Sequence, residues 1–130
     1  MGLNAPWAVW TGRVLSAVPV LLMVFSASLK LMRNPTAEQM LSGKFGYPPA
    51  SLFTIGVLET ACVVLYLVPR TAVLGAILMT AYLGAVVATH VRVGDVFAIP
   101  VLLGVLVWAG LYLRDPRIRT LVPLRDRLAR

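Results

Sequence analysis

The sequence predicts an all-α membrane protein, an antiparallel bundle of four transmembrane helices with a short interfacial helix between the first and second spans. Of its 130 residues, 59% are hydrophobic and only 13% are charged, and the mean hydropathy is +0.86. Uncharged stretches reach the length of about 20 residues that a helix needs to cross a bilayer. A water-soluble domain of this size must cover its core with polar surface, so the composition argues against that class.

Charged residues divide the chain into four apolar stretches, which lie at about residues 10–32, 51–68, 71–89 and 96–113. As helices, all four are long enough to cross about 30 Å of hydrocarbon. Four strands could not close a barrel that satisfies every backbone group in lipid. The first stretch also resembles the apolar region of a secretory signal, but no basic side chain precedes Arg13, so we favour a permanent span. We expect one domain over residues 1–130.

The basic residues predict the orientation of the bundle, because Lys and Arg favour the cytoplasmic side of a membrane. With four crossings, both termini lie on one face. That face carries eight basic residues: Arg13, Arg70, Arg114, Arg117, Arg119, Arg125, Arg127 and Arg130. The opposite face carries four: Lys30, Arg33, Lys44 and Arg92. We therefore expect both termini, and a basic tail at 114–130, in the cytoplasm.

The formal net charge is +7, from 12 basic and 5 acidic residues. In a soluble protein such an excess suggests nucleic-acid binding. Here the cations lie between the apolar stretches or in the tail, as membrane topology requires, so we expect no nucleic-acid partner. We expect the tail at 114–130 to rest on anionic lipid headgroups.

Aromatic residues near the span ends predict two interfacial belts that fix the depth of the bundle in the bilayer. The cytoplasmic belt contains Trp7, Trp10, Tyr66, Trp108 and Tyr112, and the outer belt contains Phe45, Tyr47 and Phe97.

The long connection at 33–49 is expected to hold the short interfacial helix. Asn34 is a suitable N-cap, and Pro35 follows it at the first helical position, where a missing N–H has no cost. Gly43 is a stop signal. The pattern predicts a helix over about residues 35–42 on the outer surface.

Glu59 lies about eight residues into the second stretch, close to the bilayer midplane. Its helix face is expected to point into the bundle, since it also carries Leu52, Ile55, Gly56, Cys62, Val63 and Tyr66. An ionisable group at this depth suggests a ligand contact, a proton relay or an acid–base group. The alternative is a structural role, as a helix-packing hydrogen bond or a paired buried carboxyl.

An inward stripe on the first stretch supplies companions for Glu59: Ser16, Pro19, Met23, Ser26 and Lys30 fall near one line of the helical wheel. Lys30 either extends to the lipid headgroups, which we favour, or reaches toward Glu59. Ser26 is a ligand contact or a helix-packing hydroxyl.

His90 is the single histidine and lies at the outer end of the third stretch. It is either a pH-sensitive gate or proton donor at the mouth of a cavity, or an interfacial histidine bonded to a loop. Tyr82 lies at a depth similar to that of Glu59 and can share its cavity. One histidine and a lone Cys62 provide neither haem ligands nor a zinc site, so we expect no metal and no cofactor in the chain.

Small residues recur every four positions on the third stretch, at Ala76, Thr80, Gly84 and Ala88. Such a stripe seats a neighbouring helix closely. It predicts a contact with another helix of the bundle, with a second copy in a homodimer, or with a partner membrane protein.

Several segments together resemble the DoxX-like family of small bacterial integral membrane proteins: Gly56-Val57-Leu58-Glu59, Leu65 to Thr71, Leu74-Gly75-Ala76, Thr80 to Gly84, His90-Val91-Arg92 and Gly110 to Pro116. The resemblance implies a four-helix bundle in the bacterial inner membrane. The family takes its name from a small subunit of a thiosulfate-linked quinol oxidase, so the resemblance also implies an accessory role near quinones. Branches that exchange thiols through cysteine pairs are poorly matched, because Cys62 stands alone.

Two functions from different classes follow. The first is an accessory subunit of a membrane redox system, or a binder of a small lipophilic, quinone-like ligand in a polar cavity formed by Glu59, Lys30, Ser26, Tyr82 and His90. The second is an autonomous membrane isomerase or hydrolase in which Glu59 is the acid or base for a hydrophobic substrate. The first is preferred because the candidate residues form no recognisable nucleophile–base pair.

Overall fold

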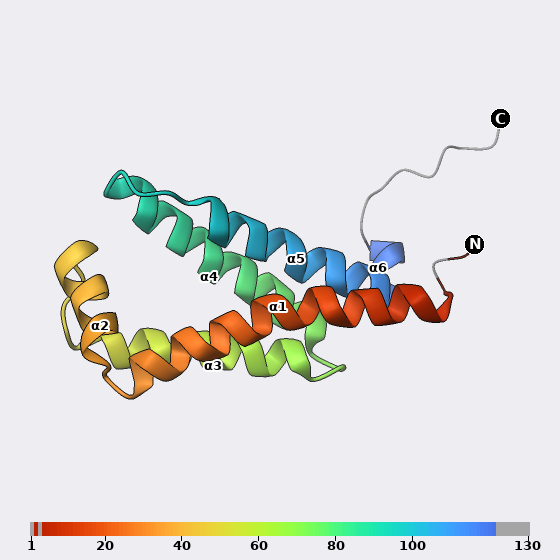
Figure 1. Ribbon diagram of the computed structural model, residues 1–130. Helices are drawn as coiled ribbons and strands as arrows, with labels where there is room; N and C mark the ends of the chain where they lie inside the picture. Colours follow the sequence, from red (N-terminus) through yellow and green to blue (C-terminus); the bar gives the residue numbers. More distant parts are fainter. Residues whose placement is uncertain (1, 3, 122–130) are drawn as a thin grey trace.

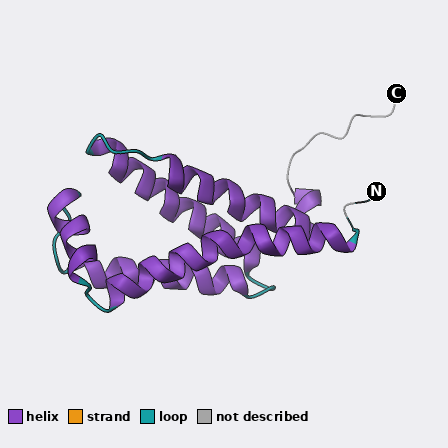
Figure 2. Cartoon of the chain, in the orientation of Figure 1, coloured by secondary structure: helices purple, strands orange, loops and turns teal. Residues whose placement is uncertain are grey.

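The computed structural model describes residue 2 and residues 4–121, and its regular elements in this part of the chain are helices (Figure 2). The long helices are α1 (Pro6–Leu31), α3 (Ser51–Leu67), α4 (Ala72–Arg92) and α5 (Ala98–Arg114). The short elements are α2 (Pro35–Glu38), the π-helical turn η1 (Gln39–Lys44) and α6 (Pro116–Leu121). The predicted all-α class is confirmed. Each predicted stretch coincides with one long helix, whereas the tail from 122 onward lies outside the described residues.

The four long helices pack as a ring in which α1 contacts α3 and α5, and α4 contacts the same two helices. Neighbours run antiparallel (Figure 1). We call the end where α1 begins and α5 ends the terminal end, and the opposite end, which holds α2 and η1, the distal end. The arrangement places each helix beside its sequence neighbour and closes the ring between α1 and α5.

Two of the helices are long and apolar enough to cross a membrane, namely α1 with 26 residues and α4 with 21, each with a mean hydropathy of 2.0. The apolar helices α3 and α5 have 17 residues each, which at 1.5 Å per residue gives about 25 Å. Large apolar side chains on the outside of the ring, such as Leu21, Phe25 and Ile99, are about two-thirds exposed. A surface of this kind is suited to hydrocarbon.

Glycines hold the helices closest at the terminal end. A Cβ atom on Gly12 would lie 2.7 Å from the carbonyl oxygen of Gly110, and one on Gly75 would overlap the backbone of Tyr66. Toward the distal end the α1–α3 pair diverges from the α4–α5 pair (Figure 1). Correspondingly, the buried residues of α4 end at Leu83, and its last two turns contain none.

A buried polar network explains why the predicted aromatic belt is wrong at Tyr66, which is fully buried. Its hydroxyl lies 2.9 Å from Ser16 Oγ and 2.8 Å from the carbonyl oxygen of Val107. The Arg114 Nε donates to Ser16 Oγ at 3.1 Å, and the guanidinium carbon lies 4.9 Å from the centre of the Tyr66 ring. Phe45 is also buried rather than interfacial, because it packs beneath the end of α4 against His90.

The connection between α1 and α3 differs from its prediction in where the helix ends. Asn34 is the N-cap as expected, with Oδ1 accepting from the backbone N–H of Thr36 at 2.9 Å. The helical segment does not stop at Gly43 but widens into η1 and continues to Lys44. The chain turns at Gly46, whose φ of +75° is a left-handed conformation that glycine adopts without steric cost.

Candidate functional site

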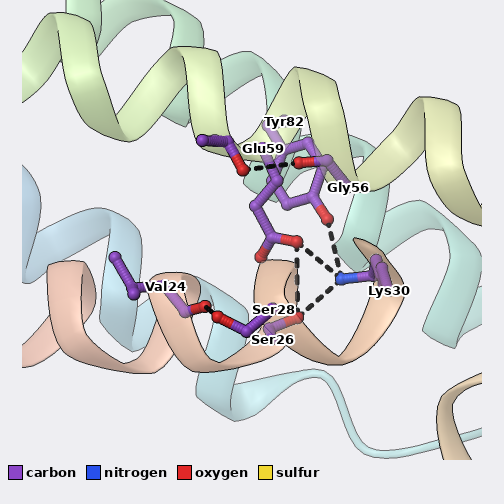
Figure 3. Close-up of polar contacts among 8 residues, drawn as sticks. Val24, Ser26, Ser28, Lys30, Gly56, Glu59 and Tyr82 are labelled. Carbon is purple, nitrogen blue, oxygen red and sulfur yellow. Dashed lines mark hydrogen bonds and ion pairs between the residues drawn. The ribbon is translucent and has the colours of Figure 1, made fainter. Parts of the chain in front are cut away.

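Four polar side chains from three helices meet inside the bundle (Figure 3). Lys30 Nζ lies 2.6 Å from Glu59 Oε2, donates to Ser26 Oγ at 2.5 Å and donates to the Tyr82 hydroxyl at 3.3 Å. Ser26 Oγ also donates to Glu59 Oε2 at 3.4 Å. We call these four residues the polar cluster. It joins α1 and α3 to α4 in the half of the bundle where the two helix pairs diverge.

Gly56 explains how a lysine in the last turn of α1 reaches a glutamate in the middle of α3. A Cβ atom on Gly56 would lie 3.0 Å from Lys30 Cβ and 3.2 Å from the Leu31 side chain, so the two helices approach closely there. Side chains on a helix lean toward its N-terminus, which directs Lys30 back into the bundle. The prediction that Lys30 extends to the headgroups is therefore wrong.

Burial makes the two charges depend on each other. Glu59 is 2% exposed, and the Lys30 side chain is 13% exposed. A single ion in such a setting carries a desolvation penalty of several kcal/mol, whereas a close pair with further hydrogen bonds offsets most of it. The contacts match the predicted paired buried carboxyl. They also gather several hydrogen-bonding groups at one place in an otherwise apolar interior.

The three N–H donors of Lys30 are all used within the cluster. An ammonium has three N–H groups, and Lys30 Nζ has three oxygen neighbours, on Ser26, Glu59 and Tyr82. The contact with Tyr82 is the longest of the three. An oxygen atom of a bound molecule would replace this contact with the least loss, and it would leave the Tyr82 hydroxyl able to donate to the same molecule.

His90 lies apart from the polar cluster. Its Nδ1 is 2.8 Å from the carbonyl oxygen of Val86, its Nε2 is 4.0 Å from Asp95 Oδ2, and its ring centre is 4.9 Å from that of Phe45. Within residues 4–121, no hydrogen bond or ion pair joins His90 to Lys30 or Glu59. The hydrogen bond of His90 is therefore to its own helix rather than to a loop, as the alternative expected, and its contacts with loop residues are those with Asp95 and Phe45.

The helix faces that lead to the cluster agree with their predictions. On α1, Ser16, Pro19 and Met23 are buried, and Ser26 and Lys30 are half-buried. On α3 the buried residues are Leu52, Gly56, Glu59, Val63 and Tyr66, while Ile55 and Cys62 are half-buried. The Tyr66 network is the feature that sequence reasoning missed. The wheel that puts Tyr66 on the face of Glu59 was the signal that could have found it.

The surface of the described helices includes a groove and a smaller cleft. The larger, of about 800 Å³, is an apolar groove along α4 and α5, and Thr80 and Gly84 of the small-residue stripe line it. Only Ala76 of that stripe is buried, so the described bundle covers little of it. The smaller hollow, of about 410 Å³, is a cleft at the distal end lined by Tyr47, Ala50, Ser51, Thr54 and Ile55. Among the described residues, no three potential metal ligands of the His, Cys, Asp or Glu type lie together.

Comparison with known proteins identifies the family. No curated protein and no solved structure matches the chain. The sequence pattern of the DoxX-like family matches residues 14–110, which include all the residues of the polar cluster and His90. The match covers most of the chain. The chain is therefore a membrane protein of the DoxX-like family.

Proposed function

We propose that the protein binds a small lipophilic ligand with a quinone-like head at the polar cluster and serves as an accessory subunit of a membrane redox system of the quinol-oxidase type. The observation that carries the proposal is the Lys30 ammonium, held 2.6 Å from a buried Glu59 carboxylate and 3.3 Å from the Tyr82 hydroxyl. Ligand pockets are mostly apolar, with a few convergent polar groups that orient the ligand. The carbonyl oxygens of a quinone are acceptors for the ammonium and phenol donors.

The proposal includes a four-span topology with both termini in the cytoplasm. The distribution of arginines and lysines supports this orientation, and the length of about 25 Å for α3 and α5 lies at the short end of the range for spanning helices. In this orientation the distal end faces outward, the polar cluster lies in the outer half of the membrane, and the basic tail meets anionic lipid headgroups on the cytoplasmic side.

The contacts of Glu59 weigh against the second hypothesis, an isomerase or hydrolase that uses Glu59 as acid or base. Both Lys30 Nζ and Ser26 Oγ donate to Oε2. A proton arriving at that oxygen would have to displace an ammonium that neutralises the carboxylate. The pair therefore disfavours proton exchange at Oε2.

Native mass spectrometry of the protein, gently extracted from the membranes of its own host, tests the proposal. We expect a lipophilic adduct on the wild type, reduced about tenfold in Glu59→Gln, because the variant weakens the charged hydrogen bond that holds the Lys30 ammonium in place for the ligand. Thr60→Val is the matched control, since the neighbouring hydroxyl donates to the carbonyl oxygen of Gly56. Tyr82→Phe should also weaken binding. Because this variant keeps the Lys30–Glu59 ion pair intact, it provides a second test if Glu59→Gln does not fold.

The outcomes separate the two functions. Co-purifying redox subunits, or an adduct lost in Glu59→Gln and kept in Thr60→Val, support the accessory and binding role. An adduct kept in both Glu59→Gln and Tyr82→Phe would contradict it. A chain that purifies alone without ligand and turns over a hydrophobic substrate would replace it with the enzyme hypothesis.

A further inference from the structure

The small distal cleft lies beside the polar cluster along α3. Ser51, Thr54 and Ile55, from the first two turns of α3, line the cleft of about 410 Å³ together with Tyr47 and Ala50. Ile55 precedes Glu59 by four residues, or one helical turn, so it lies directly on the distal side of the carboxylate on a similar face of the helix. The cleft is therefore placed between the distal surface and the cluster.

The hydroxyls of Ser51 and Thr54 in this cleft differ from four hydroxyls elsewhere on the long helices. Those of Ser28, Thr60, Thr80 and Thr89 each donate to the carbonyl oxygen four residues earlier. Within residues 4–121, Ser51 and Thr54 have no such contact and no other side-chain hydrogen bond. Their hydroxyls are available to water or to a bound molecule. No charged side chain lines the cleft, so it suits an uncharged head group with carbonyl or hydroxyl oxygens.

Contacts across the diverging helix pairs connect Tyr47, which lines the cleft, to α4. The Tyr47 hydroxyl lies 2.8 Å from Thr89 Oγ1, and the guanidinium carbon of Arg92 lies 5.8 Å from the Tyr47 ring centre. Arg92 also donates to the carbonyl oxygen of Phe45, and Lys44 Nζ pairs with Asp95 Oδ2 at 2.6 Å. These contacts tie the segment before α3 to the end of α4, where no residue of α4 is buried.

We propose that the distal cleft is an aqueous vestibule of the polar cluster, which receives the uncharged, oxygen-bearing head of a lipophilic molecule on its way to Lys30 and Glu59. The contact between Tyr47 and Thr89 is the gate of this vestibule. The nature of the ligand rests on the function proposed above. The vestibule itself rests on the cleft, on the Ser51 and Thr54 hydroxyls that have no side-chain hydrogen bond in the described part of the chain, and on the buried residues of α4, which end at Leu83.

Cysteine labelling tests the vestibule without any ligand. In a Cys62→Ser background, Phe53→Cys, Ile55→Cys and Val57→Cys are treated in membranes with a membrane-impermeant thiol reagent. Phe53 and Val57 are about half exposed on the outside of the bundle. Each lies two residues from Ile55, a rise of about 3 Å along the helix. A thiol ionises and reacts only where water reaches it, so we expect Ile55→Cys to react about tenfold faster than both neighbours.

The gate is tested in the same assay. Tyr47→Phe removes the hydroxyl that meets Thr89 and should raise the labelling rate of Ile55→Cys several-fold. Tyr112→Phe, at the terminal end, is the matched control and should leave the rate unchanged. An unchanged rate in Tyr47→Phe would overturn the gate, and an Ile55→Cys rate that merely falls between those of its two neighbours would overturn the vestibule.

A short-chain naphthoquinone provides the ligand arm, and we expect it to slow the labelling of Ile55→Cys. Fast labelling without protection by this quinone would overturn the passage of the head group and leave the aqueous vestibule standing. Slow labelling together with an adduct that depends on Glu59 would overturn the vestibule and leave the proposed function standing. The two proposals can therefore fail separately.

Discussion

Lys30 and Glu59 form one unit at the scale of the residue, because neither charge has another opposite charge among its hydrogen-bonding partners. Removing one partner of a buried pair leaves an unpaired ion in the interior, while replacing both with apolar groups leaves none. The pair as a whole therefore carries no net charge.

The pair predicts a non-additive pattern of stability. Lys30→Met should lower the free energy of unfolding by about 3 to 5 kcal/mol, because it leaves the Glu59 carboxylate buried and unpaired. The double variant Lys30→Met/Glu59→Met should lose less than Lys30→Met alone. Denaturant unfolding in detergent, followed by circular dichroism, measures both. Additive losses in the double variant would show that the two side chains do not act as a pair.

The depth and face of Glu59 could be predicted from the sequence, but its partner could not. The wheel gives the direction of each side chain on its own helix. The distance between Lys30 and Glu59 depends on how closely α1 approaches α3. Gly56 allows this close approach, but in the sequence it is one small residue among several and does not indicate which helix lies against it. Lysines near span ends commonly extend to the headgroups, so the general rule gave the wrong direction here.

At the scale of the element, two glycines of α4 have opposite surroundings. A Cβ atom on Gly75 would overlap the backbone of Tyr66 on α3, whereas a Cβ atom on Gly84 would meet nothing within 4 Å. The first glycine sets the separation of α3 and α4 at the terminal end. The second lies along the open groove between α4 and α5.

We expect Gly75→Ala to destabilise the protein by at least about 2 kcal/mol, because the backbone of α3 must move to make room. Gly84→Ala should be neutral or stabilising by up to about 1 kcal/mol, because alanine favours the helix and has space. Thermal unfolding of the two variants in the same detergent compares them directly. A comparable loss in Gly84→Ala would show instead that another chain packs on the small-residue stripe.

The long helices could be predicted from the sequence because apolar length is a property of each stretch alone. The fine structure of the connection could not be predicted in the same way. Gly43 lies inside η1, and the turn occurs at Gly46, next to Phe45, which contacts His90 and Arg92 near the end of α4. The position of Tyr66 near a helix end likewise predicts an interfacial side chain. Instead it is buried, because its hydroxyl bonds to Ser16 on α1 and to the carbonyl oxygen of Val107 on α5.

At the scale of the whole molecule, the two ends are held by different forces. The terminal end is closed by glycine contacts and the Tyr66 network, while the distal end depends on side-chain contacts such as Lys44 with Asp95. One acid–base contact also closes the terminal end. Asp115 accepts from Arg117 at 3.0 Å, and Arg117 also donates to the carbonyl oxygen of Pro69, which links α6 to the turn between α3 and α4.

This contact gives the stability of the molecule a pH dependence of known sign. The hydrogen bonds from the Arg117 side chain are the main cause that lowers the pKa of Asp115 below its ordinary value. A carboxyl with a lowered folded-state pKa stabilises the fold above its ordinary pKa, and that contribution is lost as the pH falls through the lowered value. We therefore expect the thermal midpoint in detergent to fall as the pH is lowered below about 4.

Asp115→Asn isolates the contribution of this one carboxyl. The variant should have a lower midpoint than the wild type at pH 7, since the amide cannot pair with Arg117, and a shallower fall toward acid pH, since it has one less group to protonate.

Asp95→Asn should likewise flatten the acid response, because the hydrogen bond from Lys44 is the main cause that lowers the pKa of Asp95. Equal midpoints at pH 7 and equal acid slopes in Asp115→Asn and the wild type would show that the link from α6 to the turn does not stabilise the molecule. A flattened slope in Asp115→Asn alone would place the acid sensitivity at the terminal end, where the glycine contacts and the Tyr66 network hold the helices together.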